Sequence, residues 1–269
     1  MEKDTPMDKV ALPKELDTTG LGKTARKDAW WLEPLWTGLG FAVFVVYSTW
    51  GALNPGPEGH PYYEWGPYLS PFFSPLFVVQ AWPEWWPKLA RTPALFILWA
   101  PLGFRATCYY YRKFYYRAYF MDPPACAVGE PRGQKYQGER GLFILQNMHR
   151  WFLYPALALV VILAVDGIKS YFFADGFGIG LGSIVLTINP ILLGVFTFSC
   201  NSFRHLVGGN LDCFSCSVAN KTRFKLWNKV SVLNRNHMLW AWLSLIWVGF
   251  SDLYVRMVAM GIWTDWRIL

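Results

Sequence analysis

The chain has 269 residues, of which 54% are hydrophobic, 19% aromatic and only 16% charged. This composition is typical of membrane proteins and excludes an ordinary soluble domain. The formal net charge is +7, but the basic residues gather in the predicted loops. We therefore interpret them as a signal of membrane orientation and do not favour a nucleic-acid partner. The polar N-terminal segment, residues 1–34, has no secretory signal layout, and we expect insertion through the chain's own helices.

The first predicted membrane helix covers residues 35–53, an apolar stretch of about the 20 residues that a bilayer requires. The following segment, 54–91, is rich in Pro and Trp, which disfavour regular helix and suit a loop at the membrane surface. A second helix is predicted over 92–117. Its apolar part is short, but its aromatic continuation suits the membrane interface, where we expect Arg105 to snorkel toward water.

The remaining chain predicts three further membrane helices, two basic loops and a short tail. The expected fold is therefore an all-α integral membrane protein, a bundle of five transmembrane helices. The segments after the second helix are loop 118–141, helix 142–165, helix 180–204, loop 205–237, helix 238–263 and tail 264–269.

Loop charge predicts the orientation of the bundle. Residues 105–140 carry seven Lys and Arg against three acidic residues, and 201–236 carry six against one. By contrast, 54–91 has two against three, and 166–179 has one against two. Because Lys and Arg accumulate in cytoplasmic loops, the N-terminus is predicted to be cytoplasmic and the C-terminus periplasmic, in a multi-pass protein of the bacterial cytoplasmic membrane.

Residues able to bind a metal collect toward the predicted cytoplasmic side. A single buried Cys is most often a small packing residue, but a His inside a membrane segment usually marks a polar pathway or a cofactor. His60, in the external loop, is expected to be a surface residue. The eight remaining candidates are Cys108, Cys126, His149, Cys200, His205, Cys213, Cys216 and His237.

Three local patterns refine this set. Gln146, His149 and Arg150 are spaced i, i+3 and i+4, which predicts a shared face directed into the bundle. Cys213 and Cys216 have the CxxC spacing that lets two thiolates reach one metal, and a disulfide is disfavoured on a reducing side of the membrane. Cys200 and His205 reach one centre only if their helix ends near residue 204.

The residues alone leave the cofactor open. Three intramembrane His and several Cys suit haem b, an iron–sulfur cluster or a structural zinc ion. A polar-lined transporter or a zinc-held scaffold is a further class, but no repeated halves support transport. Asp252 and Arg256, at i and i+4, are expected to neutralise each other within the last helix.

Five motifs resemble one family in order and spacing, over about residues 30–265. The family is the single-chain membrane anchor, cytochrome b-like and SdhC-type, of the mycobacterial-type succinate dehydrogenase, respiratory complex II. The motifs are FRATCYYYRKFYYRAYFMDPPACAVGEP (104–131), FILQNMHRWF (143–152), FGIGLGSIVLTINPILL (177–193), SCNSFRHLVGG (199–209) and NRNHMLWAW (234–242).

The resemblance implies a haem-free anchor with a membrane-embedded Rieske-type [2Fe-2S] cluster held by two Cys and two His. We favour His149 and His237, with Cys108 and either Cys126 or Cys200; His205 also lies in a matching motif. Phe203 stands where relatives can carry a second Cys, so Cys213 and Cys216 are alternative ligands.

The resemblance further implies that a flavoprotein subunit and an iron–sulfur subunit dock on the basic side, and that electrons pass to menaquinone or ubiquinone within membrane lipid. Arg150 is expected to favour the reduced cluster through its charge, and Gln146 or Asn147 to fix a His tautomer. Haem b is the alternative cofactor. The residues expected to contact quinone are Tyr109, Tyr111, Arg112, Arg150, Trp151 and Arg204.

Overall fold

The computed structural model describes residues 20–57, 59–76, 85, 87, 91–131 and 147–269. The chain divides into two compact units. The larger unit comprises residues 41–112 and 139–269, and the smaller comprises 1–40 and 113–138. Each is described by itself below, within these residues.

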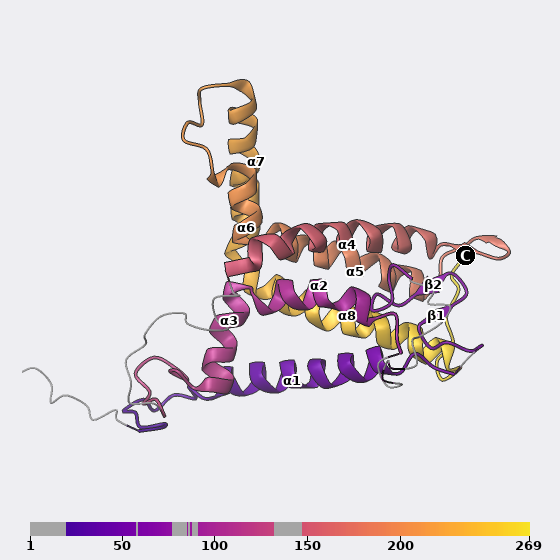
Figure 1. Cartoon of the computed structure of the whole chain (residues 1–269), viewed down its shortest axis with the longest axis horizontal. Helices are drawn as coiled ribbons and strands as arrows, with labels where there is room; N and C mark the ends of the chain where they lie inside the picture. Colours follow the sequence, from indigo (N-terminus) through magenta and orange to yellow (C-terminus); the bar gives the residue numbers. More distant parts are fainter. Residues whose placement is uncertain (1–19, 58, 77–84, 86, 88–90, 132–146) are drawn as a thin grey trace, which may run out of the picture. The chain divides into compact units, whose positions relative to one another are not determined.

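The larger unit is a helical bundle. Within the described residues of the whole chain, four helices are long and apolar enough to cross a membrane: α1 (Leu32–Leu53), α4 (His149–Lys169), α5 (Leu181–Phe198) and α8 (His237–Ala259). A fifth, α2 (Leu95–Ala106), is apolar but shorter. Figure 1 shows α2, α4, α5 and α8 running side by side along a common direction. The predicted membrane protein is confirmed, with four candidate spans where five were expected.

Small residues allow the helices to approach closely. A Cβ atom at Gly103 of α2 would lie 2.1 Å from a ring carbon of Phe152 in α4, so only glycine fits at this crossing. At Gly249 of α8 the nearest neighbours are Phe44 and Tyr47 of α1. Such small-residue contacts are how membrane helices pack, because lipid provides no hydrophobic force between them.

The helix predicted over 92–117 is interrupted. α2 ends at Ala106, and α3 (Tyr109–Tyr115) begins three residues later, followed by a π-helical turn, η2 (Tyr116–Phe120). The Thr107 hydroxyl donates to the Gly103 carbonyl at 2.7 Å and helps to close the last turn of α2. Cys108 therefore lies in a break between two helices rather than within one.

Two short β-hairpins lie in the loops that follow α1 and α4. β1 (Glu64–Trp65) pairs antiparallel with β2 (Tyr68–Leu69), with Trp65 opposite Tyr68. β3 (Phe172–Phe173) pairs in the same way with β4 (Gly176–Phe177). The first loop packs Phe72 and Phe73 into a buried cluster with Ala52 and Ala94.

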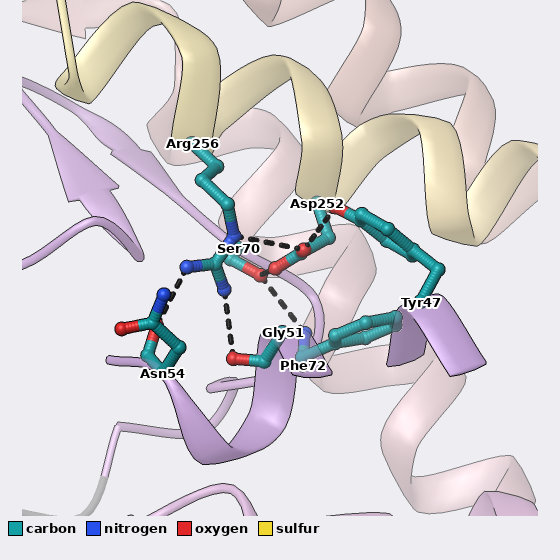
Figure 2. Close-up of polar contacts among 7 residues, drawn as sticks. All are labelled: Tyr47, Gly51, Asn54, Ser70, Phe72, Asp252 and Arg256. Carbon is teal, nitrogen blue, oxygen red and sulfur yellow. Dashed lines mark hydrogen bonds and ion pairs between the residues drawn. The ribbon is translucent and has the colours of Figure 1, made fainter. Parts of the chain in front are cut away.

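The predicted ion pair of the last helix is confirmed. Arg256 Nε lies 3.5 Å from Asp252 Oδ2, and both side chains are fully buried. Figure 2 shows how the pair joins α8 to α1 and the first loop. Tyr47 and Ser70 donate hydroxyl hydrogen bonds to the Asp252 carboxylate, while Arg256 donates to the backbone carbonyls of Gly51 and Asn54. Every charge in this network is thus matched by a partner.

The predicted loop 205–237 contains a helix that the sequence analysis did not anticipate. After α6 (Asn201–Arg204) and a π-helical turn, η4 (His205–Gly209), the chain forms α7 (Val218–Arg235). Ser217 caps α7 by accepting a hydrogen bond from the Asn220 amide at 3.1 Å. Figure 1 shows α7 running across the direction of α4 and α5 and reaching beyond them. Hydropathy alone does not reveal it, because α7 is polar.

The smaller unit ties the start of α1 to the segment after α3. The Tyr119 hydroxyl donates to the Gly38 carbonyl at 2.8 Å, and the Thr24 hydroxyl donates to the Ala127 carbonyl at 2.7 Å. Arg26 donates to the Cys126 carbonyl at 2.9 Å. Its guanidinium also donates to the Asp28 carboxylate, which lowers the pKa of Asp28.

Candidate metal centre

Two cysteines and two histidines from four segments meet at one end of the bundle. Cys108 follows α2, Cys200 follows α5, and His149 and His237 are the first residues of α4 and α8. The His149 Nε2 atom lies 2.9 Å from the Cys200 sulfur, and the His237 Nε2 atom lies 3.4 Å from the Cys108 sulfur. We call these four residues the Cys–His centre.

Hydroxyl groups behind the two rings fix which nitrogen carries the proton. The Thr107 hydroxyl lies 2.9 Å from His149 Nδ1, and the Ser199 hydroxyl lies 2.7 Å from His237 Nδ1. Thr107 already donates its own proton to the Gly103 carbonyl at 2.7 Å, and Ser199 donates to the Phe196 carbonyl at 2.8 Å. Because each hydroxyl proton is directed to a carbonyl, we assign each hydroxyl as the acceptor of an Nδ1–H. Both Nε2 atoms are left as lone-pair donors that face sulfur.

Aromatic rings enclose the Cys–His centre. Phe104 stacks on the His149 ring with centroids 4.5 Å apart, and Phe196 stacks on the His237 ring at 5.1 Å. The two Phe rings meet edge to face at 5.6 Å. Cys108 and Cys200 are each 2% exposed. The two sulfur atoms are therefore buried, and an aromatic ring covers one face of each imidazole.

Arg105 lies beside the centre rather than at the membrane surface. The expected snorkelling is wrong, because Arg105 is 8% exposed and is directed into the bundle. Its guanidinium donates to the Tyr111 hydroxyl at 2.5 Å, to the Ala241 carbonyl at 3.2 Å and to the Ser244 hydroxyl at 3.0 Å. The sequence carried one usable signal for this residue, a charged side chain inside an apolar run.

The face predicted from Gln146, His149 and Arg150 is not formed as expected. Gln146 lies outside the described residues, and α4 begins at His149, so His149 is not two turns into its helix. Asn147 and Arg150 are exposed. His149 is half-buried, whereas Arg150, the next residue, is exposed. The Thr107 hydroxyl contacts His149 Nδ1, and Asn147, which was expected to fix a His tautomer, is exposed.

The other metal-ligand candidates differ from these four residues in exposure or in bonding. Cys126 is exposed and belongs to the smaller unit. His205 is exposed at the start of η4. Cys213 and Cys216 form a disulfide, where the sequence analysis expected free thiols. The tertiary fold thus selects four of the eight candidate residues.

The six residues predicted to contact quinone differ in burial and in their partners. Tyr111 is buried, and its hydroxyl donates to the Ala241 carbonyl at 2.8 Å. Tyr109 and Trp151 are 65% and 60% exposed, and Arg112 and Arg150 lie over their rings at 4.9 and 5.6 Å. Arg204 donates to the Ser231 hydroxyl of α7 at 2.8 Å.

Comparison with known proteins finds one matching family model and a similar solved structure. The family model described as actinobacterial succinate dehydrogenase subunit SdhC matches residues 32–261. A solved chain of the Mycobacterium smegmatis Sdh1 complex in the apo form is similar, with 40% sequence identity and a TM-score of 0.81. The match covers 91% of this chain and 94% of that chain. No curated protein matches the sequence.

Proposed function

The chain belongs to the actinobacterial family of succinate dehydrogenase subunit SdhC, and we propose that it anchors the complex and carries electrons to quinone through a Rieske-type [2Fe-2S] cluster. It is a multi-pass membrane subunit of an oxidoreductase. On this proposal the flavoprotein and iron–sulfur subunits dock at the end of the bundle that carries the Cys–His centre, and electrons leave toward a quinone dissolved in the lipid.

One observation carries the cluster proposal: each imidazole Nε2 lone pair faces a buried thiol sulfur. Two thiolates and two imidazoles are the donor set of a Rieske-type cluster. The hydroxyls of Thr107 and Ser199 hold both rings in the tautomer that ligation through Nε2 requires. When bound, such a cluster supplies one-electron transfer, at a potential raised by replacing two thiolates with imidazoles.

The same geometry is less suited to the alternative groups. Within the described part of the chain, no three His, Cys, Asp or Glu residues are arranged to hold a single metal ion. Structural zinc requires four donors around one point, whereas the Cys–His centre presents two separate pairs. Haem b is disfavoured because both Nε2 atoms already face sulfur and both rings are covered by Phe104 and Phe196.

We place quinone contact on the exposed surface beside the centre. Trp151 and Arg150 follow His149 directly in α4, and both are exposed at the level of the centre. An aromatic ring that stacks on a quinone and a cation that donates to its carbonyl oxygen are the contacts such a ligand requires. Tyr109, Arg112 and Arg204 are further members of this proposed surface. Tyr111 is excluded because it is buried.

The test compares ligand variants in the assembled complex. We expect His149→Ala and His237→Ala each to abolish succinate-to-quinone activity and the rhombic EPR signal of the cluster, because each removes one donor. Succinate oxidation with a soluble artificial acceptor is expected to persist, since that reaction does not require the anchor. His205→Ala is the matched control, an exposed His expected to leave both readouts unchanged. Full quinone activity in both ligand variants would reject the assignment.

A further inference from the structure

We infer that Arg105 is the fixed counter-charge of the Cys–His centre, a positioning residue that favours its reduced form. The inference rests on the proposed function, because it concerns iron held by these four residues. It also relocates a role that the sequence analysis gave to Arg150. A charge acts strongly only where water does not screen it, and Arg150 is exposed whereas Arg105 is buried.

Arg105 has no carboxylate partner among the described residues. All the acceptors of Arg105 are neutral: a phenol, a backbone carbonyl and a serine hydroxyl. Among the described residues, Arg105 forms no ion pair. The other deeply buried arginine of the bundle, Arg256, has Asp252 beside it (Figure 2). A guanidinium remains protonated in proteins, so the positive charge of Arg105 needs compensation from another source.

The positive charge of Arg105 lies beside the Cys–His centre. Arg105 precedes Cys108 by three residues, near the end of α2. Its guanidinium lies 4.6 Å from the centroid of Phe196, the ring that stacks on His237. A single ring therefore separates the guanidinium from one imidazole of the Cys–His centre.

A cluster bound at the centre would become more negative when it is reduced. A cluster held by these four residues would supply one-electron transfer, and its charge would differ by one between its two oxidation states. A fixed positive charge in a water-poor site stabilises the more negative of the two. The Tyr111 hydroxyl holds the guanidinium in place, since it donates to the Ala241 carbonyl and accepts from Arg105.

The experiment is a redox titration of the assembled complex followed by EPR. Arg105→Gln removes the charge but keeps hydrogen-bond donors, and Arg105→Lys keeps the charge. We expect Arg105→Gln to shift the one-electron equilibrium toward the oxidised form by about tenfold, which corresponds to about 59 mV. Arg105→Lys is expected to stay near the wild-type potential. Arg235→Gln is the control, because it removes an exposed charge two residues before His237.

Iron content separates the possible outcomes. If Arg105→Gln loses iron while Arg105→Lys keeps it, the charge is required for assembly and the inference is supported. If Arg105→Gln keeps iron at the wild-type potential, the inference is overturned, although the proposed function stands. If the wild-type anchor shows no such EPR signal, the proposed function itself fails. A potential shift of equal size in Arg235→Gln would also count against a specific role for Arg105.

Discussion

Thr107 and Ser199 orient the two imidazoles of the Cys–His centre, although neither residue carries charge. Each uses its hydroxyl proton on a backbone carbonyl and accepts from a His Nδ1–H. Both carbonyls belong to the last turn of a helix that ends at the centre, α2 for Thr107 and α5 for Ser199. The way these helices end therefore sets the direction of both lone pairs.

A residue-scale prediction follows for these hydroxyls. We expect Thr107→Val and Ser199→Ala each to weaken iron retention by about 10–100-fold, the usual effect of removing a hydrogen bond behind a metal-bound His. Iron release to a chelator, followed by the EPR signal, measures the effect. Thr197→Val is the matched control, because its buried hydroxyl donates only to the Leu193 carbonyl of its own helix. Equal iron retention in all three variants would contradict the orienting role.

The elements bring the ligands together through their ends. The ligand-bearing segments follow α2 and α5 or open α4 and α8, so the separations between these helices set the distances within the Cys–His centre. Gly103 of α2 packs against Phe152 of α4, four residues before Thr107 and five before Cys108. A change in helix spacing at this point is therefore transmitted to two residues of the site.

At the element scale, we predict that Gly103→Ala disturbs the centre from a distance. The new Cβ would meet the Phe152 ring at 2.1 Å, which forces α2 and α4 apart. Overpacking of this kind typically costs about 1–3 kcal/mol. Thermal unfolding of the complex and its EPR signal are the measurements. Adding Phe152→Ala is expected to restore part of both.

Gly194→Ala is the control for this prediction. A Cβ at Gly194 of α5 has its nearest neighbour at 3.5 Å, an ordinary contact, so the substitution is expected to be tolerated. If Gly103→Ala were tolerated as well, α2 and α4 would not be tightly packed at this crossing.

At the scale of the whole molecule, the orientation across the membrane remains a prediction from loop charge. Cys126 is an exposed free cysteine, whereas Cys108 and Cys200 are buried and Cys213 and Cys216 form a disulfide. We expect a membrane-impermeant maleimide to label Cys126 only after the cells are permeabilised. A cysteine introduced by His60→Cys, in the loop predicted to be external, is expected to react in intact cells.

The Cys126→Ser variant shows how much of the labelling belongs to Cys126. Labelling of Cys126 in intact cells, with protection at position 60, would reverse the orientation. The soluble subunits would then have to dock at the other end of the bundle, and the proposed electron path would lose its support.

Several features were determined by the sequence alone. The apolar segments fixed the membrane class and the approximate positions of α1, α4, α5 and α8, because the length of a span depends only on local hydropathy. The spacing of Asp252 and Arg256 predicted their ion pair, since helix geometry places i and i+4 together. Motifs along the chain indicated the family. These are local properties, and local chemistry is sufficient to predict them.

Only the tertiary structure decided which candidate residues meet. The sequence offered eight metal-binding residues, but the break after α2 and the ends of α4, α5 and α8 bring together Cys108, His149, Cys200 and His237. Local pattern also failed to place Arg105, which is buried, and Arg150, which is exposed. The direction of a side chain in a bundle depends on neighbours that are distant in the chain. The hydropathy of the local sequence does not predict those neighbours.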